Sequence, residues 1–312
     1  MVSTLLVLSA AAGLAHGYTV VVAKQYMLKN IDPLVVPGQY KSHMHSFFGS
    51  DAVTVNTTTS AEIMSGCSTT NNQNDLSVYW VPTLYTNVNK QYNPIAPMRF
   101  SAYYVAIESA EIAIPPNFKA IAGNSSASTQ AGTVPLSGFS WFCENGPSKA
   151  TNADPGAFPT STCSTHLQSL LLFHDCVNPT TLESAYSGTQ NWRTGFKPAN
   201  RCPADMKRIP QLRFSIRYDL RKALPNGWSG QPPLELACGS SYCWHGDFIN
   251  GWVPEAAQDM LKSNDKREFR RVVGPNDSKV RGKELCKVED ARDADPDRGT
   301  SDFAKSRAAL GL

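Results

Sequence analysis

The chain has 312 residues and a formal net charge of +3, and 18% of its residues are charged. So small a charge does not indicate a nucleic acid or an anionic membrane surface as partner. No stretch after the first 17 residues approaches the roughly 18 uninterrupted apolar residues of a membrane-spanning helix, so no membrane span is expected. The 21 glycines and 21 prolines are typical of a compact extracellular protein rich in turns.

The first predicted element is a secretory signal peptide over residues 1–17. Its apolar stretch runs from Leu5 to Leu14, and the small residues Ala15 and Gly17 follow at the usual cleavage positions. We therefore expect a mature chain that is secreted into the medium or the cell wall.

Cysteines and glycosylation sequons agree with that route. All eight cysteines follow the signal peptide, and an even number in a secreted chain predicts up to four disulfides whose pairing the sequence does not reveal. Sequons for N-glycosylation begin at Asn56, Asn124 and Asn276.

Short strands separated by turns are predicted along most of the mature chain. The β-branched run at 18–23 predicts a strand, and residues 32–38 predict an extended segment that ends in a turn. Further strands are expected at 76–80, 99–106, 118–123, 138–142, 213–218 and 234–238. This pattern indicates a mainly β protein, a single β-sandwich or jelly-roll-like domain over residues 18–255 with long loops and disulfides.

The character of the sequence changes after Pro254. Residues 255–262 predict a helix, and residues 256–312 form a C-terminal extension crowded with charges of both signs. We expect this extension to be partly disordered and pinned at Cys286.

Two polar pairs are the first candidates for chemistry. His43 and His45 lie two residues apart, as do His245 and Asp247, and residues with this spacing share one face of a strand. If the pairs meet, three imidazoles and one carboxylate suit one divalent Zn, Mn, Fe or Cu ion. Two other interpretations stay open: a metal-free acid–base pocket, and side chains that only hydrogen-bond one another where strands pack.

A third block places Asp75 and Tyr79 on one face of a predicted strand. A carboxylate, a phenol and a nearby imidazole are the groups that general acid–base cleavage of a sugar polymer needs. Hydrolysis would use Asp75 and Asp247 as paired carboxylates, and β-elimination would use a histidine base with Tyr79 as acid. The structural alternatives are a loop cap for Asp75 and a core contact for Tyr79.

Aromatic residues near these blocks are candidates for stacking on sugar rings. The residues concerned are Trp80, Tyr85, Trp244 and Trp252. Aromatic residues make up 10% of the chain, so most of them are expected in the core.

Four blocks in fixed order resemble a fungal secreted family known as domain of unknown function 1996. They are Asp-Pro-Leu-Val-Val-Pro-Gly at 32–38, His-Met-His-Ser-Phe-Phe-Gly at 43–49, Asp-Leu-Ser-Val-Tyr-Trp-Val-Pro-Thr-Leu-Tyr at 75–85 and His-Gly-Asp-Phe-Ile-Asn-Gly-Trp at 245–252. The resemblance covers about residues 25–255. It implies an association with the fungal cell surface and its glycans and convergence of the polar blocks on one site, but no established reaction.

The leading prediction is a secreted enzyme that cleaves an extracellular or cell-wall polysaccharide. Its pocket would be lined by His43, His45, Asp75, Tyr79, His245 and Asp247, with His45 or His245 as base and Tyr79 or Asp75 as acid. One alternative is a non-catalytic wall protein that binds glycan through its aromatic residues. Another is a metal-dependent redox protein.

Overall fold

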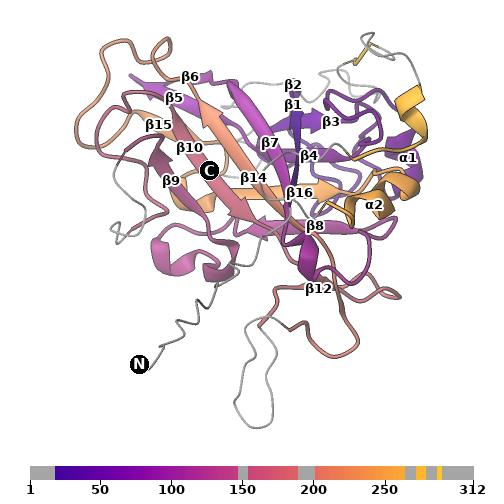
Figure 1. Cartoon of the computed structure of the whole chain (residues 1–312). Coiled ribbons are helices and arrows are strands. Elements are labelled where there is room, and N and C mark those ends of the chain that lie inside the picture. The colour runs from indigo at the N-terminus through magenta and orange to yellow at the C-terminus, as the bar shows by residue number, and fades with distance from the viewer. Residues whose placement is uncertain (1–17, 147–153, 189–200, 264–271, 279–286, 290–312) are drawn as a thin grey trace, which may run out of the picture.

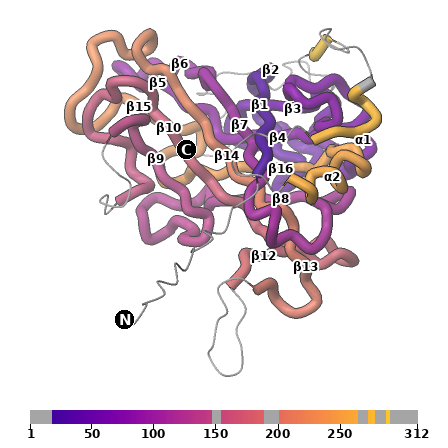
Figure 2. Tube along the Cα trace, in the orientation of Figure 1, coloured from indigo at the N-terminus to yellow at the C-terminus, as the bar shows by residue number. Residues whose placement is uncertain are grey.

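The fold is described from a computed structural model of the chain. The structure describes residues 18–146, 154–188, 201–263, 272–278 and 287–289 (Figures 1 and 2). The predicted signal peptide at 1–17, Cys286 and most of the C-terminal extension lie outside these residues.

Two five-stranded antiparallel sheets make up the centre of the molecule. The first sheet has the order β1 (Thr19–Ala23), β7 (Arg99–Val105), β14 (Gln211–Tyr218), β10 (Leu167–Leu172) and β9 (Ser140–Cys143). The second has the order β2 (Gln25–Lys29), β3 (His45–Gly49), β4 (Val78–Pro82), β16 (His245–Ile249) and β8 (Lys119–Gly123).

The two sheets pack face to face through aromatic side chains. Phe48 of the second sheet stacks on Phe100 of the first, with ring centroids 4.1 Å apart, and Tyr79 meets Phe214 edge-on at 5.8 Å. Figure 1 shows β14 and β16 crossing where the sheets meet. The predicted mainly β sandwich is therefore confirmed, and its interior is dominated by rings whose offset and edge-on contacts stabilise it.

The outer face of the second sheet is buried as well. Strand side chains alternate between faces, so Phe47 and Trp80 point away from the sandwich interior, and their rings stack at 5.5 Å. Ile31, from the connection between β2 and β3, and Val53 and Ile63, from the segment that carries α1 (Ser60–Met64), cover them in a second apolar cluster. Every residue of β3, β4 and β16 is consequently buried.

Smaller elements surround the sandwich. They are the sheets β15–β5–β6 (Leu234–Leu236, Leu84–Val88, Gln91–Pro94) and β12–β11–β13 (Ser184–Ala185, Cys176–Val177, Lys207–Arg208), the helix α2 (Pro254–Met260), and the 3-10 turns η1 (Ile107–Ser109), η2 (Gln130–Gly132), η3 (Pro135–Ser137), η5 (Ser241–Cys243) and η6 (Pro275–Ser278). Among the described residues, no helix is both long and apolar enough to cross a membrane.

Disulfides tie down the loops. Those within the described residues join Cys143 to Cys163, Cys176 to Cys202 and Cys238 to Cys243. Cys67 is also disulfide-bonded. The predicted disulfide framework is therefore present.

Each of the seven predicted strands overlaps a strand of the structure, but β10 was not predicted and the predicted extended segment is wrong. Residues 32–38, predicted to be extended, form turns, because the Asp32 carboxylate accepts the backbone N–H groups of Leu34 and Val35. The predicted helix after Pro254 is α2, and its Ala256 and Met260 are buried in the main core, so the packed part of the chain continues through this helix.

Candidate metal centre

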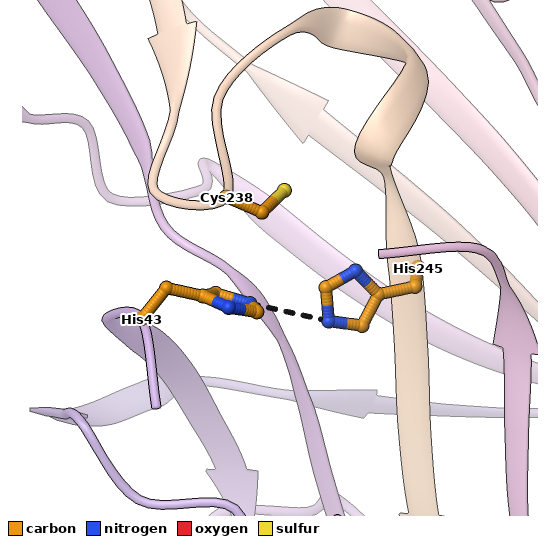
Figure 3. Close-up of side chains that lie close together, drawn as sticks. All are labelled: His43, Cys238 and His245. Atoms are coloured by element: carbon orange, nitrogen blue, oxygen red, sulfur yellow. Dashed lines mark hydrogen bonds between the residues drawn. The ribbon is translucent and has the colours of Figure 1, made fainter. Parts of the chain in front are cut away.

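Three imidazoles and one carboxylate meet on the outer face of the second sheet. The Nε2 atom of His245 lies 3.2 Å from Nε2 of His43 (Figure 3). It also lies 3.4 Å from Nε2 of His45 and 3.8 Å from Oδ2 of Asp247. The strand order β3–β4–β16 brings them together, although about 200 residues separate the two pairs in sequence.

Backbone carbonyls fix two of the imidazoles. The Nδ1–H of His45 donates to the Ile31 carbonyl at 3.0 Å, and the Nδ1–H of His245 donates to the Cys243 carbonyl at 2.7 Å. A carbonyl oxygen only accepts, so Nδ1 carries the proton in both rings and Nε2 carries a lone pair. Two lone pairs therefore face each other at 3.4 Å with no proton between them.

Burial keeps these groups uncharged. It lowers the pKa of His43 and of His45 well below the usual value, and it lowers the pKa of His245 to about 4. Burial, and then the nearby Asp32 carboxylate, raise the pKa of Asp247 well above its usual range. Burial thus favours the neutral form of the imidazoles and of the carboxyl group, and a cation at this place would favour the carboxylate.

The geometry fits a metal ion. Nitrogen ligands lie about 2.0–2.1 Å from Zn²⁺, so two ligands at a tetrahedral angle are about 3.3 Å apart, close to the observed 3.2 and 3.4 Å. The ligand atoms of His45, His245 and Asp247 all lie within 4.8 Å of one another. His43 joins the group through its contact with His245.

Cys238 lies beside the His43–His245 pair without being a ligand (Figure 3). Its sulfur is within 4.8 Å of ligand atoms of both histidines, but it is bonded to Cys243. A disulfide has no thiolate to offer a metal. The bridge instead closes the turn that ends two residues before His245, which holds the Cys243 carbonyl against that ring.

Asp75 and Tyr79 are not part of this centre. Tyr79 pairs with Phe248 in the β4–β16 ladder and points into the sandwich, whereas Asp247 and its partner Trp80 point outward. The Tyr79 hydroxyl donates to Oδ2 of Asp75 at 2.6 Å, and burial raises the pKa of Asp75 to about 6. Strand alternation thus separates the six predicted pocket residues into two clusters on opposite faces of one sheet.

The Asp75 cluster continues through buried hydroxyl groups. The hydroxyl of Tyr104 lies 2.8 Å from that of Tyr79 and accepts the indole N–H of Trp252 at 2.8 Å. Each of these side chains is at most 2% exposed. The arrangement gives buried polar groups their partners between the two sheets.

The aromatic residues proposed for sugar stacking are in the interior. The exposed fractions are 0% for Trp80 and Trp244 and 2% for Tyr85 and Trp252. Trp244 packs on Trp141 with centroids 4.7 Å apart, and Tyr85 clusters with Met44 and Ala237. The stacking floor expected from the sequence is therefore not on the surface, because these rings fill the core.

The structure adds residues that pattern reasoning did not select. Asp32 sets the charge environment of Asp247, and the carbonyls of Ile31 and Cys243 orient two rings. An Asp-Pro pair is a turn signal, so Asp32 was detectable as a turn residue. Nothing local in the sequence identifies a carbonyl that orients a distant ring.

Comparison with protein families gives one match. The family model described as a domain of unknown function, DUF1996, matches residues 32–252. This range begins at Asp32 and includes every residue of the centre. Searches of curated proteins and of solved structures found no match.

Proposed function

Since the chain belongs to the DUF1996 family, whose name carries no activity, we propose a function from the site itself: the protein binds one divalent transition-metal ion through His43, His45, His245 and Asp247. The residues are close together, the Nε2 lone pairs of His45 and His245 face each other, and all four residues lie in the region that the family model matches.

Asp247 carries the proposal. Both of its oxygens are buried and neither has a hydrogen-bond partner among the described residues. An ionised carboxylate left unpaired in the interior costs several kcal/mol, so buried carboxylates are paired, protonated or bound to metals. A cation in front of His245 Nε2 supplies the missing partner, and it also occupies the space between the two facing imidazole lone pairs.

The chemistry of the ligands limits which metal ions the site could bind. Imidazole nitrogen suits Zn, Cu, Fe and Ni, and the set has no thiolate. The Nε2–Nε2 distances of 3.2 and 3.4 Å match tetrahedral coordination, which is the usual geometry of Zn²⁺ sites in proteins, and they therefore favour Zn²⁺. A bound ion of this kind polarises a substrate oxygen or lowers the pKa of a coordinated water toward neutrality.

The substrate class remains the one expected from the sequence, an extracellular or cell-wall polysaccharide, and secretion likewise stays part of the proposal. Disulfides in the described residues support an oxidising compartment. Asp75 and Tyr79 lie between the sheets, so the proposed cleavage depends on the metal centre in their place.

Metal binding is tested by dialysing the protein against a chelator, adding Zn²⁺, and measuring bound metal by mass spectrometry and the melting temperature. We expect one ion per chain and a higher melting temperature on loading. His245→Ala should abolish both effects. His174→Ala is the matched control, because His174 bonds Ser184 outside the centre. The proposal is contradicted if wild-type protein contains no bound metal after Zn²⁺ is added, or if His245→Ala binds as much metal as wild type.

Cleavage is tested by mass spectrometry of products after incubating metal-free and Zn²⁺-loaded protein with a panel of polysaccharides. Products that need the metal and carry one added water per cut support hydrolysis, and unsaturated ends support elimination. Glycan binding by the loaded protein without any product supports the non-catalytic alternative.

A further inference from the structure

Resting on the proposed metal centre, we infer that His43 is a displaceable ligand. In this arrangement His45, His245 and Asp247 hold the ion, and His43 covers a coordination position that a small anionic or neutral donor takes when the imidazole leaves. The distinction matters because structural zinc sites use four protein ligands, whereas catalytic sites use three and keep one position open.

His43 is held less firmly than the other two histidines. His45 and His245 belong to central strands, and each donates Nδ1–H to a backbone carbonyl. His43 precedes β3, outside any strand, and among the described residues its one hydrogen-bonding contact is with Nε2 of His245. Without a hydrogen-bond partner on Nδ1, its ring is oriented by its contact with His245 Nε2 and by packing on the His45 ring, whose centroid lies 4.2 Å away.

His43 is also the most exposed of the three histidines. His43 is 8% exposed, against 0% for His45 and 2% for His245. Gln39 and Lys41, four and two residues before His43, are exposed, although Ser42 between Lys41 and His43 is buried. Solvent therefore approaches the centre from the side of His43.

The next residue limits the motion that is required. The carbonyl of Met44 accepts the backbone N–H of Thr83 at 2.9 Å, and its side chain packs with Tyr85. The backbone is thus fixed immediately after His43, so rotation of one side chain opens the position while His45 stays in place.

The three remaining ligands form a complete set. Ligand atoms of His45, His245 and Asp247 lie within 4.8 Å of one another, and two imidazoles with one carboxylate are a known triad for metals with open positions. In Figure 3, His43 approaches His245 from across the gap, with the Cys238 sulfur beside them. That sulfur is in a disulfide, so it does not take the position that His43 leaves.

The charge at the centre limits the incoming group. Among the ligands alone, a divalent cation with the Asp247 carboxylate leaves one positive charge, which the nearby Asp32 carboxylate partly offsets. A small donor with one negative charge, such as hydroxide, or a neutral donor therefore suits the position. Azide is a suitable probe of the same charge, and imidazole replaces the side chain chemically.

The test uses full-length chains loaded with Co²⁺, whose visible spectrum reports coordination, and titrated with azide or imidazole. We expect His43→Ala and the bulkier His43→Gln to keep about one ion per chain, while His45→Ala loses it. Azide should bind His43→Ala about tenfold or more tightly than wild type, because in wild type it competes with the imidazole. His174→Ala should behave as wild type.

Three results overturn the inference. If both His43 variants lose Co²⁺ as completely as His45→Ala does, the centre needs four protein ligands. If they keep Co²⁺ but azide leaves the spectrum unchanged, the position is closed. If wild type binds no metal at all, both the proposed function and the inference fail. The first two results contradict only the inference, so the two kinds of failure are distinguishable. Circular dichroism of each variant identifies loss of fold.

Discussion

Asp247 lies directly opposite Trp80 across the ladder that joins β16 to β4, yet the two side chains share no hydrogen bond. Both Asp247 oxygens and the indole nitrogen of Trp80 are buried without partners among the residues that the structure describes. The carboxylate is directed at the His245 imidazole instead. An unpaired buried acid beside a potential donor is what the proposed cation site would require.

Asp247→Asn should have opposite effects on the metal-free and metal-loaded protein. Burial raises the pKa of Asp247, so folding of the metal-free protein must protonate this carboxyl at neutral pH, and a neutral amide of similar shape avoids that cost. The variant should therefore raise the free energy of unfolding of the metal-free protein by about 1–3 kcal/mol. The same change should abolish the stabilisation by Zn²⁺. Urea unfolding with chelator and with Zn²⁺ measures both, and Asp219→Asn at an exposed ion pair is the control. A less stable metal-free variant would show that Asp247 already has a partner.

Tyr79→Phe should lower stability without touching the metal. The variant loses the hydroxyl that donates to Asp75 at 2.6 Å, which should lower the free energy of unfolding by about 1–3 kcal/mol. Since Tyr79 faces the other side of the sheet, bound Zn²⁺ per chain should stay at the wild-type value. Unfolding curves and metal analysis on one preparation test this, and reduced metal content would indicate that the two clusters are coupled.

Asp75→Asn should change how stability depends on pH. The folded pKa of Asp75 is raised from 3.8 to about 6, so the folded state binds a proton that the unfolded state releases between these values. Stability from Asp75 is therefore present at low pH and is lost as the pH rises through about 6. The stability of wild type minus that of Asp75→Asn should fall from pH 4 to pH 7, by up to about 3 kcal/mol at about 1.36 kcal/mol per pH unit. A difference independent of pH would refute the shift.

Gly246→Ala should destabilise the sandwich. A Cβ at Gly246 would lie 2.8 Å from Cε2 of Phe214, too close without movement of a buried ring. Overpacking of this kind costs about 1–3 kcal/mol. Gly132→Ala is the control, because its nearest contacts are at 3.4 Å. Equal melting temperatures for the two variants would mean that the ring moves freely.

Trp80→Ala should unfold the protein rather than remove a sugar contact. Trp80 is 0% exposed and stacks on Phe47, and truncating such a side chain costs about 3–5 kcal/mol. Thermal melting measured beside any glycan-binding assay separates the two effects, with Leu136→Ala at an exposed position as control. A variant that melts like wild type but binds glycan less would restore the stacking role.

The sequence predicts which side chains share a face of one strand, but it does not predict the order of the strands in the sheet. Alternation correctly placed His245 and Asp247 on one face of β16, because this follows from the period of a strand. Asp75 lies before β4, and a hydrogen bond to its side chain, not strand period, joins it to Tyr79. Alternation did not reveal that Tyr79 and Asp247 face opposite sides of the same sheet. That depends on the non-local order β3–β4–β16, which no local pattern encodes.

Turn chemistry explains the other difference. The β-branched residues of 32–38 suggested extended chain, but the Asp32 side chain satisfies the N–H groups of Leu34 and Val35 and bends the segment over the outer face. The burial of the tryptophans could not be predicted either, because the local sequence around an aromatic residue in a short strand is similar whether its side chain faces solvent or the core.

Strand β16 alternates His245 and Asp247 outward with Gly246 and Phe248 inward. If β16 paired one residue out of step, the imidazole and carboxylate would enter the apolar interior and the phenyl ring would leave it. Misassembly is therefore penalised on both faces at once. The residues of the proposed centre meet only when β3, β4 and β16 are correctly ordered, so metal binding by the refolded protein would report that this sheet has formed.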